Sequence, residues 1–151
     1  MNLKLSDLQI ASFNREGVLL IDQLIDPFLA DKIAERYKQL FRGEFETGVQ
    51  PDEINWQEDE SSKDFTRQIC NGWKADRTLA RVVLREDIGK AGAKLAQWPG
   101  ARVMQDNVIW KPVGARPIGF HQDNSYLDWF KPSETLTCWI ALDDTTAEGG
   151  T

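Results

Sequence analysis

The chain contains, at residues 119–124, the stretch Gly119-Phe120-His121-Gln122-Asp123-Asn124, around which the rest of the sequence is best interpreted. This stretch holds the only histidine of the 151 residues, followed two positions later by a carboxylate. In a β-strand, side chains at positions i and i+2 point to the same face. The spacing therefore directs the imidazole of His121 and the carboxylate of Asp123 toward one place. Together they would supply two of the three ligands in the 2-His-1-carboxylate triad that binds non-haem Fe(II).

A histidine and an aspartate at this spacing form a short pattern, and a lone histidine is more often structural than a metal ligand. Other chemistries have less support in this sequence. A serine nucleophile would be expected in a G-x-S-x-G turn, which the sequence lacks. No glycine-rich loop followed by lysine is present to bind phosphate. Catalysis by paired carboxylates stays open, because no spacing in the sequence favours or excludes it.

The composition, with 41% hydrophobic and 28% charged residues, is that of an ordinary globular protein. The length suits one core, so we expect residues 1–151 to form a single domain. A net charge of -6 argues against nucleic-acid or anionic-membrane partners, because no basic surplus is available to bind phosphates. Cys70 and Cys138 lie far apart, which predicts neither a disulfide framework nor a zinc site and favours a cytoplasmic location. We also expect no signal peptide and no membrane span.

Helix-capping residues predict that residues 1–98 are mainly helical. Ser6, Asp26 and Asp76 are each followed by apolar residues at helical spacing, and each is a residue type that caps helix N-termini. A further helix is expected over about residues 88–98. The polar region between the second and third helices spans about residues 44–74 and contains an acidic cluster. Such a region predicts a solvated loop, which could also act as a substrate lid.

Strands are expected mainly after the helices, in residues 101–151, and their alternation of apolar and polar side chains is uneven. In residues 102–111, polar side chains occur in both series of alternate positions, so both faces of the expected strand carry them. This is expected of a strand with one face toward a wet pocket. Helices first and strands second indicate an α+β fold. The expected strands are residues 18–21, 102–111, 118–123 and 135–143.

An ordered set of motifs resembles the phytanoyl-CoA dioxygenase family, whose members are Fe(II)- and 2-oxoglutarate-dependent oxygenases. The stretch FNREGVLLI at residues 13–21 also resembles the opening helix and strand of that family. The resemblance therefore spans most of the chain and is loose only in the polar region before the third helix. The main motifs are QDNVIWKP at 105–112, FHQD at 120–123, CWIALDD at 138–144 and EGG at 148–150.

The resemblance implies a double-stranded β-helix (jelly-roll) core with the helices packed outside it. In such an enzyme His121 and Asp123 match the first two iron ligands, with no catalytic residue expected beyond the ligands. Asn107 and Trp139 match positions beside 2-oxoglutarate, although Trp139 could equally pack in the core. The enzyme would use O₂ and 2-oxoglutarate to hydroxylate a small organic substrate, whose identity the sequence does not indicate. The candidate residues on the substrate side are Tyr126 and Trp129.

The family pattern continues after its Glu-Gly-Gly motif with a second histidine ligand and an arginine that pairs with 2-oxoglutarate. This sequence has neither at a corresponding position. Three hypotheses follow: a hydroxylase that is active in a longer form, a non-catalytic binding or assembly module with a relic metal pocket, and a fragment that folds only partly. An exposed sheet edge after residue 143 would also allow the chain to close its sheet against another copy, as a homo-oligomer.

Overall fold

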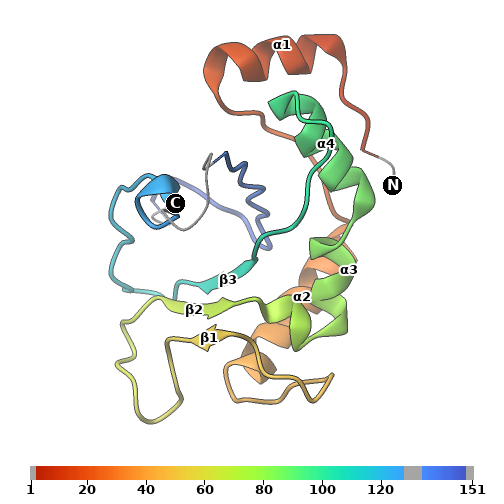
Figure 1. Ribbon diagram of the computed structural model, residues 1–151. Coiled ribbons are helices and arrows are strands. Elements are labelled where there is room, and N and C mark those ends of the chain that lie inside the picture. The colour runs from red at the N-terminus through yellow and green to blue at the C-terminus, as the bar shows by residue number, and fades with distance from the viewer. Residues whose placement is uncertain (1–2, 128–133, 149–151) are drawn as a thin grey trace.

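The computed structural model describes residues 3–127 and 134–148, in which four helices lie to one side of and above a small antiparallel sheet in the view of Figure 1. These described residues have an α+β architecture, as the sequence predicts. The helices are α1 (Asp7–Glu16), α2 (Pro27–Leu40), α3 (Arg77–Val83) and α4 (Glu86–Ala96). The strands are β1 (Glu53–Ile54), β2 (Arg67–Cys70) and β3 (Asn107–Trp110), and the 3-10 turns are η1 (Gly72–Lys74) and η2 (Asp123–Ser125).

The helices begin where the capping residues predict. Ser6 accepts a hydrogen bond from the backbone N–H of Gln9, whose side chain accepts one from the N–H of Ser6, so the two residues form a capping box. Asp26 accepts a hydrogen bond from the backbone N–H two residues on, at 2.9 Å. Asp76 caps α3, and the predicted helix starts are therefore confirmed. None of the helices in the described chain has the length and apolar character needed to cross a bilayer.

The sheet has the order β1-β2-β3, and both of its pairings are antiparallel. Ile69 on β2 lies opposite Val108 on β3, and both are almost completely buried. Cys70 lies opposite Asn107, which is exposed. Because side chains alternate between the faces of a strand, one face of the sheet packs on the core, and the other presents Asn107 outward.

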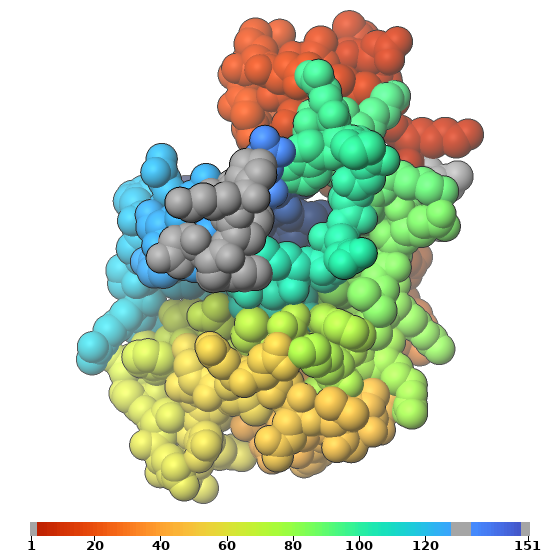
Figure 2. Space-filling view, viewed as in Figure 1, coloured from red at the N-terminus to blue at the C-terminus, as the bar shows by residue number. Residues whose placement is uncertain are grey.

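Two apolar clusters hold the helices in place. The first lies between the core-facing side of the sheet and helices α2 and α3, and the second joins the N-terminal segment to α4, with α1 packed against it. The space-filling view shows α1 lying against α4 (Figure 2). The C-terminal segment links them, because Ile140 and Leu142 pack on the first cluster and Leu136 on the second. The principal buried residues of the first cluster are Ile33, Leu40, Phe41, Trp56, Ile69, Leu79, Val82 and Val108.

The prediction of a loop at residues 44–74 was wrong in part, because β1 and β2 lie within it, although the acidic cluster at residues 58–60 lies in an exposed turn as expected. The region looks polar since few of its side chains reach the core, chiefly Trp56 and Ile69. Arg67, the first residue of β2, would not be expected on the core-facing side of a strand from its charge alone. The strands also come earlier than expected, so residues 1–98 are not purely helical.

Three other expected strands are not strands in the described chain, and the fourth is shorter than expected. A strand requires a neighbour that continues its hydrogen-bond ladder. Among the described residues such a ladder joins only β1, β2 and β3. Residues 18–21 are only half-buried, since Leu19 and Ile21 pack on the second cluster while Val18 and Leu20 are exposed. The three segments that lie outside any strand are residues 18–21, 118–123 and the described residues of 135–143, and β3 covers only Asn107–Trp110 of the expected 102–111.

Asp87 attaches the N-terminal segment to the start of α4. Its carboxylate accepts hydrogen bonds from Nε and Nη2 of Arg85, at 2.9 and 2.7 Å, and from the backbone N–H of Leu3, at 2.9 Å. These bonds, that from Arg85 above all, hold the pKa of the Asp87 carboxyl well below its usual range. A carboxyl with a lowered pKa in the folded state stabilises the fold above the unfolded pKa, and this contribution is lost as the pH falls through the folded pKa.

We therefore expect Asp87→Asn to lower the free energy of unfolding at pH 7, and the difference from the parent to shrink below about pH 4, where the unfolded carboxyl titrates. Urea denaturation at several pH values between 7 and 3 measures this difference. Glu86→Gln, at the exposed carboxylate of the preceding residue, is the matched control and should change the free energy of unfolding little. A loss of stability in Asp87→Asn that stays constant with pH would contradict the assignment.

Candidate functional site

His121 and Asp123 lie side by side after β3, at the beginning of η2. Nε2 of His121 is 3.3 Å from Oδ1 of Asp123, and the two side chains are 41% and 51% exposed. The structure brings the two side chains together by a turn, where the sequence predicted a strand. The pair is open to solvent and to small molecules.

The His121 ring is held by Nδ1, the nitrogen that does not face Asp123. Nδ1 lies 2.8 Å from the carbonyl oxygen of Gly119, which can only accept a hydrogen bond, so Nδ1 is the nitrogen that carries the hydrogen. In the neutral ring the lone pair is then on Nε2, the atom that faces Asp123. Tyr126 packs its ring edge-to-face against the imidazole, with the ring centroids 5.9 Å apart. Both contacts fix the orientation of the imidazole.

Asp123 is also held by the atom that points away from its partner, the oxygen Oδ2. Its Oδ2 accepts a hydrogen bond from Oγ1 of Thr137 at 3.0 Å, while Oδ1 is the oxygen beside His121. Thr137 is not among the site residues that the sequence predicts. Its only sequence signal was its place in residues 135–143, on the side opposite Leu136. That side is exposed in the structure, and Leu136 is half-buried.

Tyr126 packs against His121, whereas two other predicted site residues in the described chain form no hydrogen bond with the pair. Asn107 is on the exposed face of the sheet, and Trp139 is 59% exposed, so Trp139 is not a core residue in the described chain. No hydrogen bond or ring contact among the described residues links either of them to His121 or Asp123. Trp129, predicted on the substrate side, lies outside the described residues.

Asp106 fixes the chain at the start of β3, directly before Asn107. Its Oδ1 accepts a hydrogen bond from the backbone N–H of Trp73 at 3.1 Å, and its carbonyl accepts one from the N–H of Asn71 at 2.8 Å. Burial raises the pKa of the Asp106 carboxyl, and the backbone N–H donors of η1 oppose that rise. We infer that Asp106 positions Asn107 and is itself part of the scaffold.

The chemistry and spacing of the pair fit two neighbouring ligands of one metal ion. Two ligand atoms at right angles and about 2.1 Å from an octahedral metal are about 3 Å apart. Nε2 and Oδ1 are 3.3 Å apart, and a neutral imidazole with a carboxylate is a ligand combination that non-haem Fe(II) takes. Among the described residues, no group of three His, Cys, Asp or Glu side chains is close enough to hold a metal. The described residues therefore offer two candidate metal ligands at this place.

Arg67 does not serve as the cation for a cosubstrate beside Asn107. Its guanidinium carbon lies 3.8 and 4.2 Å from the ring centroids of Trp56 and Trp110, in a double cation–π contact. Its Nε is buried and has no hydrogen-bond partner within the described chain. Arg67 also lies on the side of β2 that carries Ile69, which is the core side, opposite Asn107. The contact stabilises the sheet.

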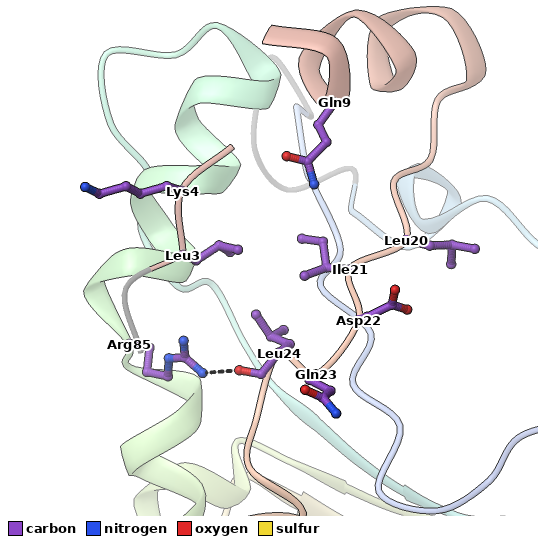
Figure 3. A pocket seen from close by; sticks show the side chains of 9 residues that line it. All are labelled: Leu3, Lys4, Gln9, Leu20, Ile21, Asp22, Gln23, Leu24 and Arg85. Atoms are coloured by element: carbon purple, nitrogen blue, oxygen red, sulfur yellow. Dashed lines mark hydrogen bonds between the residues drawn. The ribbon is translucent and has the colours of Figure 1, made fainter. Parts of the chain in front are cut away.

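A cavity of about 470 Å³ lies elsewhere, between the N-terminal segment, residues 20–24 and the start of α4 (Figure 3). Its main charged group already has partners, because Arg85 donates to the carbonyl of Leu24 at 2.6 Å and to Asp87. The Gln9 side chain that points into it also caps α1. None of the predicted site residues in the described chain lines this cavity, so it is separate from the His121–Asp123 pair.

The fold and the pair define an α+β protein with two neighbouring side chains of metal-ligand type. Comparison with protein families makes the class specific, because the model for phytanoyl-CoA dioxygenase (PhyH) matches residues 13–151. The chain belongs to this family, and the resemblance drawn from the sequence motifs is confirmed. Members of the family typically use Fe(II) and 2-oxoglutarate. No curated protein and no solved structure gives a significant match.

Proposed function

We propose that this chain belongs to an Fe(II)- and 2-oxoglutarate-dependent hydroxylase of a small organic substrate, with His121 and Asp123 as two ligands of the iron. The observation that carries the proposal is the 3.3 Å approach of Nε2 and Oδ1, in a chain that matches the phytanoyl-CoA dioxygenase family over most of its length. The hydrogen bond of His121 to Gly119 leaves Nε2 available as a ligand atom.

The roles of the residues follow from their positions. The bound iron and 2-oxoglutarate would supply the oxidising chemistry, in which O₂ converts 2-oxoglutarate to succinate and CO₂ while a substrate C–H becomes C–OH. His121 and Asp123 would hold the metal. Asn107 and Trp139 would lie beside the cosubstrate. The ring of Tyr126, already packed against His121, would border the substrate.

The proposal includes a larger β-structure than the described sheet. We place β1-β2-β3 as one wall of a jelly-roll core, within one domain over residues 1–151. Two observations support this placement. The sheet face with Asn107 is exposed, as an inner wall without its opposite wall would be. In residues 135–143 the alternate side chains of Leu136, Ile140 and Leu142 are also half-buried between exposed neighbours, as in a strand, with Cys138 as the exception.

Anaerobic titration with Fe(II) in the presence of 2-oxoglutarate tests the proposal. We expect a charge-transfer absorption band in the parent chain and its loss in His121→Ala and Asp123→Asn, with metal affinity lowered by about 100-fold or more, since even outer-sphere changes cost about 10- to 100-fold. Asp22→Asn, at an exposed carboxylate on the N-terminal part of the chain, is the matched control and should behave as the parent. A parent chain without the band would contradict the proposal and favour a non-catalytic binding or assembly module.

A further inference from the structure

One hydrogen bond joins the turn that carries the candidate ligands to the C-terminal segment. Oγ1 of Thr137 donates to Oδ2 of Asp123 at 3.0 Å, across fourteen positions of the sequence. The other carboxylate oxygen, Oδ1, faces Nε2 of His121. Each of the two oxygens of Asp123 therefore has a different neighbour, and only Oδ1 points toward the candidate metal position.

This division between the two oxygens has a chemical consequence. A carboxylate binds a metal through one oxygen or through both. A hydrogen bond to one oxygen favours binding through the other and fixes the plane of the carboxylate, as outer-sphere partners of metal ligands commonly do. We propose, on the basis of the function proposed above, that Thr137 is a positioning residue that holds Asp123 as a ligand through Oδ1 alone.

The core fixes the position of the Thr137 hydroxyl. Leu136, the preceding residue, packs on the cluster that contains Leu5, Ala91 and Leu95. Ile140, three residues on, packs on the cluster between the sheet and the helices. Thr137 is thus anchored on both sides while its own side chain faces outward to Asp123.

The arrangement matches the one found at the other candidate ligand. Gly119 holds His121 by Nδ1 and leaves Nε2 to face Asp123, as Thr137 holds Asp123 by Oδ2 and leaves Oδ1 to face His121. In each case the far atom of the side chain is bound by the protein, and the near atoms of the two side chains converge. The Thr137 hydroxyl therefore orients Asp123 in the same way as the Gly119 carbonyl orients His121.

Anaerobic Co(II) titration, followed by visible absorption, tests the proposal on the whole chain. Thr137→Val keeps the shape of the side chain and removes the hydroxyl. We expect it to weaken Co(II) binding about tenfold, in the range of outer-sphere changes, and to alter the intensity of the Co(II) bands as the carboxylate binding mode changes. Thr137→Ser keeps the hydroxyl and should restore both readouts. Thr135→Val, at an exposed threonine of the same segment, should match the parent.

The outcomes separate this inference from the proposed function. If the parent binds Co(II) and Thr137→Val gives the same affinity and spectrum, the role of Thr137 is refuted and the proposed metal site stands. If Thr137→Val and Thr137→Ser are equally weak, packing rather than the hydroxyl is responsible, and the role is again refuted. If the parent binds no better than His121→Ala, the metal site itself is wrong and Thr137 has no ligand to position.

Discussion

Replacing Asp76 with alanine is expected to lower the free energy of unfolding by about 3–5 kcal/mol, the usual cost of removing one partner from a buried ion pair. Asp76 is 0% exposed. Its Oδ2 accepts a hydrogen bond from Nε of Arg36 at 2.5 Å. Its Oδ1 accepts the backbone N–H groups of Thr78 and Leu79, at 2.8 and 3.0 Å. The substitution would leave the guanidinium without its carboxylate and the first turn of α3 without its cap.

Urea denaturation at neutral pH measures this loss, and two variants divide it. Asp26→Ala removes only an exposed cap at the start of α2 and should cost about 1 kcal/mol. Asp76→Asn keeps an oxygen for the cap and removes the charge that pairs with Arg36, so its loss should lie between the other two. If Asp76→Ala costs no more than Asp26→Ala, the ion pair between α2 and α3 contributes nothing, and the two helices are held by apolar packing alone.

Helix caps can be predicted from the sequence, whereas the tertiary contacts of the capping residues cannot. The caps Ser6, Asp26 and Asp76 act within three residues of themselves, so the sequence identified all of them. The sequence did not show that Asp76 also binds Arg36, forty positions earlier, and is therefore fully buried. A local signal predicted the start of the helix, and a tertiary contact determines how much that residue contributes.

The strands were harder to predict for the same reason. β2 begins with Arg67, whose charge argues against a core-facing position, yet two tryptophans stack on its guanidinium and make that position stable. Residues 18–21 have the apolar composition of a buried strand. They have no ladder partner in the described chain, and their alternate side chains remain exposed. Strand formation depends on a partner that the segment itself does not specify.

In the candidate site, too, contacts between neighbours in the sequence were predictable and contacts with distant segments were not. The spacing of His121 and Asp123 was visible in the sequence, because two residues separated by one position are held close by the chain itself. The contact from Thr137 comes from a distant segment. The contact from the Gly119 carbonyl is made by the backbone, for which no residue type is diagnostic. The atoms that would bind a metal were therefore predictable, and the Thr137 hydroxyl and the Gly119 carbonyl that orient them were not.

A second large effect is expected at Ile69, in the middle of the central strand. Ile69 is 0% exposed and lies opposite Val108 in the sheet. Ile69→Ala should lower the free energy of unfolding by about 2–5 kcal/mol, the range for large-to-small substitutions that leave a cavity in a core. Ile109 is the matched control, because it is an isoleucine on the neighbouring strand that faces the opposite side and is 36% exposed. Ile109→Ala should cost about 1 kcal/mol or less.

The comparison of these two isoleucines, by urea denaturation at two protein concentrations, tests which face of the sheet is covered in solution. Asn107 lies on the side of Ile109, so the face that should border a cosubstrate is the one that the structure leaves exposed. A small loss in Ile109→Ala means that this face is open to ligands. A loss as large as that of Ile69→Ala would mean that something covers it. If that loss also increased with protein concentration, the cover would be a second copy of the chain, because only an association between copies makes stability depend on concentration.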